Sequence, residues 1–248
     1  MEWRVIKLET NSAARNMAID NAVMDSVRAG AAKPTIRFYM WKPSAVSIGC
    51  FQSMNDEVNI DRCNAVGVAY VRRLTGGGAV YHDMDGEITY SVIGSEDIFP
   101  KNIIESYKTI CSWIIDGLSR LGIKAEFAPI NDIIVSGKKI SGNAQTRREG
   151  VLLQHGTVLY KVDVERMFSL LNVANEKISD KMIKNAKERV TSVSSYSDAT
   201  ISELYAALLA GFTEGKDFSY GTLSKEESEK ADMLEREVYS TYEWNFNR

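Results

Sequence analysis

The sequence has few of the residues that hold metal ions or form disulfides. Its 3 cysteines, Cys50, Cys63 and Cys111, are odd in number and far apart, and its 2 histidines are His82 and His155. No C-x-x-C pair occurs. These shortages argue against a structural zinc site and against a disulfide framework.

Long apolar runs and an excess of positive charge are also missing. No apolar run approaches the roughly 20 residues that a membrane span requires. The N-terminal MEWRVIKLET lacks the apolar segment of a signal peptide. Against 33 acidic residues there are 30 basic ones, so the net charge is -3 rather than the basic excess typical of nucleic-acid binders. We therefore expect a cytoplasmic protein with neither a membrane nor a nucleic acid as its partner.

No internal repeat, low-complexity tract or Pro-, Gly- or Ser-rich linker divides the chain. Of its 248 residues, 44% are hydrophobic and 25% are charged. This composition is ordinary for a soluble globular protein, and the length is enough to bury a full core. One compact domain over residues 1–248 is the simplest prediction.

Hydrophobic periodicity predicts two long helices. Residues 11–30 form the first, with Asn11 or Ser12 as its N-terminal cap and Gly30 at its end. Residues 102–122 form the second, because their apolar side chains recur at helical spacing. Further helices are expected near the C-terminus, where TISE and SKEE match the capping-box pattern.

The other apolar runs predict strands joined by short turns. Three of them, separated by SGK and RREG turns, indicate an antiparallel meander. Strands and helices do not alternate regularly, which argues against a doubly wound parallel fold. The prediction is an α/β (α+β) fold with mostly antiparallel or mixed sheets flanked by helices. Strands are expected at residues 2–9, 34–41, 45–51, 68–74, 86–93, 125–135, 138–146 and 151–160.

Three consecutive glycines, Gly76, Gly77 and Gly78, stand within the stretch YVRRLTGGGAVYHD, residues 70–83. This stretch has no lysine where a Walker A loop needs one. It also fails the dinucleotide fingerprint G-x-G-x-x-G, because Tyr81 replaces the last glycine. Two interpretations are open: a glycine-rich hairpin turn, or a loop that lets an anionic ligand approach the backbone.

The two arginines before the glycines favour the second interpretation. Arg72 and Arg73 are successive residues of an expected strand, so their side chains point to opposite faces. If one face is buried, one arginine is drawn to the interior, where it needs an anionic partner. A phosphate group would satisfy it with two hydrogen bonds.

A second candidate site lies in NDIIVSGKKISGNAQTR, residues 131–147. Lys138 and Lys139 alternate across a strand, so one of them can face a ligand as a compact cation. Gly142 marks a close approach of the backbone, and Asp132 could bind Mg²⁺ through a carboxylate oxygen. The alternative is a solvated hairpin with two exposed lysines. The two histidines have no nucleophile within their local motifs, and a structural role is the commoner one for a lone histidine.

Taken together, these segments resemble the lipoate-protein ligase A family of the biotin/lipoate ligase superfamily. The matching pieces follow the family's order from roughly residue 10 to residue 195: RNMAIDNAV, PSAVSIGCFQS, RRLTGGGAVYHD, NDIIVSGKKISGNAQ, QHGTVLY and ERVTSV. The resemblance implies an α/β domain with a mostly antiparallel sheet, related to biotin protein ligase and to the catalytic core of class II aminoacyl-tRNA synthetases.

The resemblance also implies a reaction. Members of the family activate lipoate with ATP and Mg²⁺ to lipoyl-AMP, release pyrophosphate, and transfer the lipoyl group to a lysine of a lipoyl domain. The implied acceptors are 2-oxoacid dehydrogenase E2 subunits and the glycine cleavage H protein.

The family's site residues transfer to matching positions of this sequence. Lys139 is the implied catalytic residue, contacting lipoate and the α-phosphate, and Asp132 is the implied Mg²⁺ ligand. The implied ligand-binding residues are Arg72, Arg73, Gly76, Gly77, Gly78, Ala79, Val80, Tyr81, His82, Asp132, Lys139, Gly142, His155 and Gly156.

The sequence departs from the family at its C-terminus. Full-length bacterial members carry a small accessory domain there, and nothing in this sequence resembles it. Three explanations are open: the accessory domain is a separate polypeptide, the sequence is truncated before it, or the protein never had one. We favour the first and expect a single catalytic domain that works with a separate accessory subunit.

Three other functions are alternatives: an octanoyltransferase fed by acyl carrier protein, a biotin ligase, and a non-catalytic lipoate-binding module. Octanoyltransferases of this superfamily use an acyl-thioester cysteine. No cysteine follows Cys111, near or beyond Lys139, so the sequence favours the ATP-dependent ligase.

Overall fold

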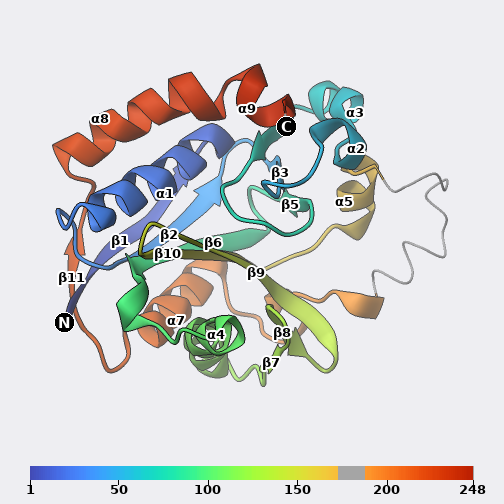
Figure 1. Cartoon of the computed structure of the whole chain (residues 1–248). Coiled ribbons are helices and arrows are strands. Elements are labelled where there is room, and N and C mark those ends of the chain that lie inside the picture. The colour runs from blue at the N-terminus through green and yellow to red at the C-terminus, as the bar shows by residue number, and fades with distance from the viewer. Residues whose placement is uncertain (173–187, 248) are drawn as a thin grey trace.

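An 8-stranded mixed sheet forms the centre of the molecule (Figure 1). The computed structural model describes residues 1–172 and 188–247. β1 runs parallel to both of its neighbours, and the strands from β2 to β7 in the sheet order pair antiparallel. The predicted mixed or antiparallel sheet is thus confirmed. In sheet order the strands are β11 (Asp217–Gly221), β1 (Glu2–Asn11), β2 (Thr35–Trp41), β6 (Glu87–Ser95), β10 (Val151–Leu159), β9 (Lys138–Arg148), β8 (Asp132–Val135) and β7 (Glu126–Ala128).

A second, 3-stranded sheet carries the glycine motif. It consists of β4 (Ala69–Arg72), β3 (Ala45–Ile48) and β5 (Val80–His82), with β3 in the middle. β3 is parallel to β4 and antiparallel to β5. The three consecutive glycines therefore lie in the connection between the two edge strands of the small sheet.

Helices cover both faces of the large sheet (Figure 1). On one face α1 (Ala13–Arg28) packs against β6 and β10, and α8 (Lys225–Leu234) packs on α1. On the other face lie α4 (Ile103–Ser119) and α7 (Ile201–Thr213). The remaining helical elements are α2 (Met54–Glu57), α3 (Ile60–Ala65), α5 (Val164–Leu170), α9 (Tyr242–Phe246), the 3-10 turns η1 (Glu96–Ile98) and η2 (Val193–Ser195), and the π-helical turn η3 (Glu235–Tyr239).

The predicted helix caps are present. The Ser12 hydroxyl accepts a hydrogen bond from the Arg15 amide, so Ser12 rather than Asn11 caps α1. Gly30 follows α1 with φ +70°, a conformation that glycine adopts without steric cost. The capping boxes at the starts of α7 and α8 are both formed.

α4 and α7 pack closely because a glycine removes the side chain between them. A Cβ atom at Gly211 would lie 2.3 Å from the carbonyl oxygen of Trp113. The apolar face of α4 then buries Ile110, Ile114 and Leu118 against the sheet. Each such side chain contributes about 1.5–3 kcal/mol on burial.

Two strand predictions differ from the structure in detail. Residues 125–135 form two strands, β7 and β8, because Pro129 lies between them and has no amide to donate to a ladder. The strands on either side of Pro43 belong to different sheets. Among the described residues, no helix combines the length and apolar character needed to cross a membrane.

Candidate active site

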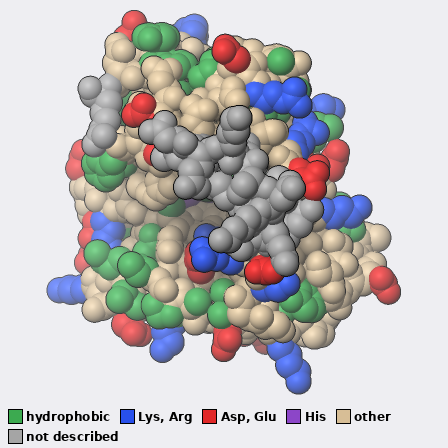
Figure 2. Space-filling view, turned by 90° about the vertical axis from the view of Figure 1, so that its right-hand side faces the viewer, with side chains coloured by type: hydrophobic (Ala, Val, Ile, Leu, Met, Phe, Trp, Pro, Cys, Tyr) green, Lys and Arg blue, Asp and Glu red, His purple; other side chains and the backbone are tan. Residues whose placement is uncertain are grey.

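One cavity brings together most of the residues that the sequence singles out. It encloses about 300 Å³ between the glycine connection and strands β2, β9 and β10, and its lining is more apolar than polar. Figure 2 looks onto a side of the molecule that is hollowed near its centre, where basic and acidic side chains meet at the rim.

The glycine connection folds tightly onto the end of β3. The carbonyl oxygen of Gly77 comes so close to Gly49 that a Cβ atom there would lie 2.2 Å from it. Gly77 itself has φ +94°, a conformation that side-chain-bearing residues rarely adopt. A bare backbone is therefore required at these two positions by the close approach and by the positive φ.

Arg73 is buried beneath this connection, with 5% of its surface exposed. Its Nε donates to the Thr75 hydroxyl, Nη1 to the carbonyl and hydroxyl of Ser47, and Nη2 to the carbonyls of Gly76 and Gly78. A guanidinium group has five N–H donors. These bonds match that number, so the chain itself occupies the whole donor set.

Two chains of polar groups lead from Arg73 to buried carboxylates, and only the first is hydrogen-bonded along its whole length. In the first, the Ser47 hydroxyl lies 2.8 Å from Nε2 of His82, and Nδ1 of His82 lies 2.7 Å from Oε1 of Glu87. His82 also stacks on Trp41, with ring centroids 4.0 Å apart.

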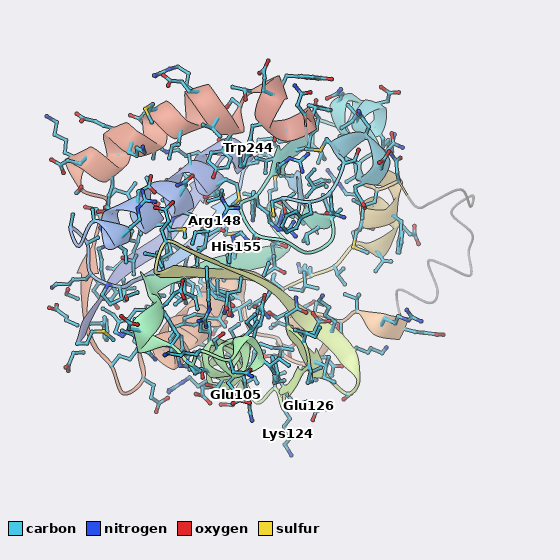
Figure 3. The ribbon with its side chains drawn as sticks, viewed as in Figure 1. Glu105, Lys124, Glu126, Arg148, His155 and Trp244 are labelled. Atoms are coloured by element: carbon cyan, nitrogen blue, oxygen red, sulfur yellow. The ribbon has the colours of Figure 1, made fainter. Side chains whose placement is uncertain are left out.

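The second chain runs through the other histidine. The Thr75 hydroxyl lies 2.7 Å from Nε2 of His155, and Nδ1 of His155 lies 3.6 Å from Oδ2 of Asp20. His155 is two residues from Leu153, which packs in the core beneath α1, so both side chains face α1 (Figure 3). Asp20 in turn accepts hydrogen bonds from Arg37 and Ser91.

Burial controls the protonation of these groups. It lowers the pKa of His155, although the nearby Asp20 carboxylate acts in the opposite direction. For Asp20, burial raises the pKa, but His155, Arg37 and Ser91 together outweigh it and hold the pKa below its ordinary value. Burial lowers the pKa of Arg73 to about 10, so its guanidinium stays charged at neutral pH.

Arg72 points away from the cavity and ties down the C-terminal helix. Its Nε donates to the carbonyl of Trp244, and the indole of Trp244 donates to the carbonyl of Arg72, both at 2.9 Å. Its other donors reach carbonyls of Asn245 and of residues 49–52. Among the described residues, Arg73 has no direct contact with an anionic group of the kind expected for a buried arginine; backbone carbonyls and hydroxyls accept its hydrogen bonds instead.

Lys139 stands on the opposite wall of the cavity. Its Nζ lies 2.7 Å from Oδ1 of Asp132, and both side chains are partly exposed. The strand pairing shifts register at this point, since Ile133 pairs with Ser141 but Ile134 pairs with Lys139. Such a bulge re-aims side chains. It brings Lys139 and Gly142, three residues apart, onto the same side of β9.

Glycines on β9 and β10 leave room for polar side chains. A Cβ atom at Gly142 would lie 2.6 Å from Cε of Lys139, and one at Gly156 would lie 2.1 Å from Oδ1 of Asn143. The Tyr90 hydroxyl donates to the same Asn143 oxygen at 2.7 Å. Each glycine therefore lets one polar side chain lie flat across its neighbouring backbone.

The cysteines lie elsewhere. Cys63 and Cys111 are buried, and burial raises their pKa values to about 11 and about 12. Cys50 is partly exposed, and its amide bonds to the carbonyl of Thr75. Within residues 1–172 and 188–247, no cysteine lines the cavity.

Most of the residues proposed for ligand binding meet in this cavity, although their roles stay predictions. Arg72, Gly76 and Asp132 do not line it. Arg72 bonds to the C-terminal helix, Gly76 accepts a hydrogen bond from Arg73, and Asp132 forms an ion pair with Lys139. The predicted residues that do line the cavity are Arg73, Gly77, Gly78, Ala79, Val80, Tyr81, His82, Lys139, Gly142, His155 and Gly156.

Sequence reasoning missed the groups that support these residues. Ser47, Thr75, Glu87 and Asn143 gave no motif of their own. Asp20 did give a signal, because it is a carboxylate on the apolar face of the first predicted helix, where a partner is required.

Comparison with known proteins gives the site a context. The family described as lipoyl protein ligase A/B catalytic domain matches residues 12–213. The octanoyltransferase LipM of Brevibacillus brevis is 37% identical over 276 aligned residues, covering 100% of this chain and 99% of that protein. LipM of Geobacillus kaustophilus is 35% identical to this chain, and the alignment covers 99% of this chain and 98% of that protein.

Solved structures agree with the predicted fold and superfamily. A chain of the bi-partite lipoate protein ligase of Thermoplasma acidophilum, described with its E2 lipoyl domain, has a TM-score of 0.90 and 35% identity, covering 99% of this chain and 96% of that chain. A lipoate-protein ligase A bound with ATP has a TM-score of 0.85 and 33% identity, covering 99% of this chain and 98% of that chain. The expected mixed α/β fold of the biotin/lipoate ligase superfamily is thus confirmed.

The predicted activity needs a correction. ATP-dependent ligation of lipoate through lipoyl-AMP is contradicted, because relatives that match over their whole length are named octanoyltransferases. Related solved structures are described with bound ATP and with bound lipoic acid, whereas the expected use of ATP and Mg²⁺ by this chain is not confirmed. The sequence argument rejected the octanoyltransferase because no cysteine follows Cys111, whereas the similarity over the whole chain favours it.

Proposed function

Because the chain belongs to the lipoyl protein ligase A/B catalytic-domain family, we propose that it transfers an octanoyl group from a carrier-protein thioester to a lysine of a lipoyl domain. The chain is an enzyme of a family of ligases and transferases. The relatives' names support the octanoyl group as cargo. The observation that carries the proposal is the cavity in which Lys139 faces the glycine connection across a mostly apolar space.

The residues of the cavity have separate tasks in this reaction. The neutral amine of the acceptor lysine attacks the thioester carbonyl, and negative charge develops on the carbonyl oxygen. Lys139 and the backbone amides of Gly77 and Ala79 stabilise that charge, as preorganised positive groups do in an oxyanion hole. The new C–N bond forms, the C–S bond breaks, and the proton lost by the amine leaves with the carrier thiol.

The described cysteines favour direct transfer from carrier to acceptor. A thiol with a pKa near 11 or 12 is a poor nucleophile at neutral pH, and Cys63 and Cys111 are also buried. Cys50 is partly exposed but does not line the cavity. The proposed transfer therefore departs from the thioester-cysteine route of other octanoyltransferases in this superfamily and has no acyl-enzyme intermediate, and positioning of the two substrates supplies much of the rate.

The test is a transfer reaction without nucleotide. The chain is incubated with octanoyl-carrier protein and a lipoyl domain, and mass spectrometry reads octanoyl addition to the domain. We expect addition at one lysine, no addition when that lysine is replaced by arginine, and unchanged activity after alkylation of accessible thiols. Modification that arises only from a free fatty acid or lipoate together with Mg·ATP would overturn the proposal.

The partners extend the proposal. We infer that the acceptors are lipoyl domains of 2-oxoacid dehydrogenase E2 subunits and the glycine cleavage H protein. The similarity to a bi-partite protein described with its E2 lipoyl domain supports an acceptor of this kind. One catalytic domain over residues 1–248 and a separate accessory subunit also stay predictions. Transfer at full rate by the isolated chain would remove the need for that subunit.

A further inference from the structure

The direction of every hydrogen bond around Arg73 is fixed by the chemistry of its ends. A guanidinium only donates, so the hydroxyls of Ser47 and Thr75 accept from it. Each hydroxyl then has its own proton available for the adjacent Nε2 atom, on His82 or His155. A hydroxyl can also accept a second hydrogen bond, so the carboxylates at the far ends select this direction: an imidazole whose Nδ1 faces a carboxylate carries its proton there.

The carboxylates at the far ends match that direction. Nδ1 of His82 points at Glu87, whose Oε1 also accepts from the Thr89 hydroxyl. Nδ1 of His155 approaches Asp20 at 3.6 Å, beyond hydrogen-bond length but close enough for attraction. Each chain therefore runs from a carboxylate through an imidazole and a hydroxyl to the same guanidinium.

The guanidinium, in turn, sets the orientation of the glycine connection. Arg73 Nη2 holds the carbonyls of Gly76 and Gly78 at 2.7 and 2.8 Å. In a trans peptide the carbonyl and the following amide point in opposite directions. The amides of Gly77 and Ala79 therefore point away from Arg73, and both residues line the cavity. No hydrogen bond between described residues uses these two amides.

We propose that Arg73 is a positioning residue, clamped by the Glu87–His82–Ser47 and Asp20–His155–Thr75 chains, which turns the amides of Gly77 and Ala79 toward the reacting carbonyl. The oxyanion contacts these amides and Lys139, while Arg73 acts through the loop. The kinetic consequences of this assignment rest on the proposed acyl transfer. The hydrogen-bond directions that it assigns do not depend on that function.

The first experiment reads the histidine tautomers in the resting protein. The chain has only 2 histidines, so a tag-free sample labelled with ¹⁵N-histidine gives signals from His82 and His155 alone. We expect both rings to be protonated on Nδ1 and bare on Nε2 at neutral pH. Ser47→Ala should disturb only the His82 signals, and Thr75→Val only those of His155. A proton on Nε2 of either ring overturns the proposed direction of that chain.

The second experiment measures coupling to Arg73. Ser47→Ala and Thr75→Val should each lower kcat for octanoyl transfer about tenfold, since each removes a hydrogen bond to a charged group, with little change in KM. Thr75→Ser should restore the rate. In an Arg73→Lys background both substitutions should lose most of their effect. If Ser47→Ala and Thr75→Val lower kcat by the same factor in the Arg73→Lys background as in the wild type, the two residues do not act through Arg73.

The two proposals fail in distinguishable ways. If the wild-type chain does not transfer octanoyl groups, the proposed function is wrong, and the tautomer measurement still decides the clamp. If transfer occurs but the tautomers or the coupling differ from expectation, the clamp is wrong and the transferase stands.

Discussion

The ammonium group of Lys139 reaches Asp132 by lying across Gly142, the residue that pairs with Asp132 in the neighbouring strand. Nζ and Oδ1 are 2.7 Å apart, and the side chains are 41% and 34% exposed. A pair this exposed contributes less than about 1 kcal/mol to stability. Its effect is to fix where the positive charge stands in the cavity, so changes at these residues should act on catalysis more than on folding.

Replacement of the lysine itself gives the first prediction. Lys139→Ala should lower octanoyl transfer by about 100-fold or more, the usual effect of removing one oxyanion donor. The free energy of unfolding should change by less than about 1 kcal/mol. Lys138→Ala is the matched control, because Lys138 is the adjacent lysine and does not line the cavity. Equal losses in the two variants would contradict a specific role for Lys139.

Alanine at the two strand glycines should separate activity from stability. In Gly142→Ala the new Cβ meets the flexible end of Lys139 at 2.6 Å, which can move aside, so transfer should fall while the melting temperature holds. In Gly156→Ala it meets Asn143 at 2.1 Å and the backbone oxygen of Gly142 at 2.9 Å. That contact cannot relax cheaply and should cost about 1–3 kcal/mol. Thermal melts and initial rates on both proteins check the contrast.

The sequence shows that glycines are important in this site, but it does not show which atoms each glycine makes room for. A close backbone approach was predicted at Gly142, where the structure instead places the side chain of Lys139 against the glycine. Close backbone approach occurs at Gly49 and Gly156, for which the sequence made no such prediction. The partners are invisible in sequence, because they come from distant segments: Gly77 for Gly49, and Asn143 on the adjacent strand for Gly156. Helices and caps were predictable because their signals are local. The bulge at Lys139 was not, since it depends on pairing between strands.

The glycine connection provides the third prediction. The structure separates the effect of valine at Gly77 from its effect at Gly78. A Cβ at Gly78 meets nothing within 4 Å, so Gly78→Val should fold normally while filling the cavity and lowering transfer by tenfold or more. Gly77 has φ +94°, and a Cβ atom there would lie 3.0 Å from Nη2 of Arg73, so Gly77→Val should lose stability as well. Urea unfolding of both variants measures the difference.

Arg72 should matter for stability and not for chemistry. Arg72→Ala removes the hydrogen bonds that join α9 and residues 49–52 to β4, leaving buried carbonyls without donors. We expect a loss of about 3 kcal/mol, or roughly 6–12 °C in melting temperature for a chain of this size. Arg62→Ala is the control, because Arg62 is an exposed arginine on α3. Full stability of Arg72→Ala would contradict this account.

For Arg72 and Arg73, the sequence predicts the directions of the side chains but not the groups that they contact. Alternation along a strand correctly separates Arg72 from Arg73, one toward the C-terminal helix and one toward the cavity. The anionic contact was predicted because the charge of a buried cation needs a compensating partner. At Arg73 the chain meets that need with carbonyl and hydroxyl oxygens and with carboxylates one imidazole away, and no local sequence pattern predicts either.

The lowered pKa of His155 predicts how stability depends on pH. Burial favours the neutral ring, while the ordinary pKa of about 6.5 applies in the unfolded chain. As pH falls below that value the unfolded chain binds a proton that the folded protein refuses. Stability should therefore decline until the folded pKa is reached, by about 1.4 kcal/mol for each unit between the two pKa values.

The comparison protein for this pH dependence is His155→Gln, which cannot titrate in this range. Arg73 and His82 also face the ring and oppose its protonation, whereas Asp20 favours it. Urea unfolding at pH 7, 6 and 5, as roughly spaced points around the unfolded pKa, should show a steeper loss for the wild type than for the variant. Since His82 remains in both proteins, its contribution cancels in the difference. Parallel curves would mean that His155 titrates alike in the folded and unfolded chains.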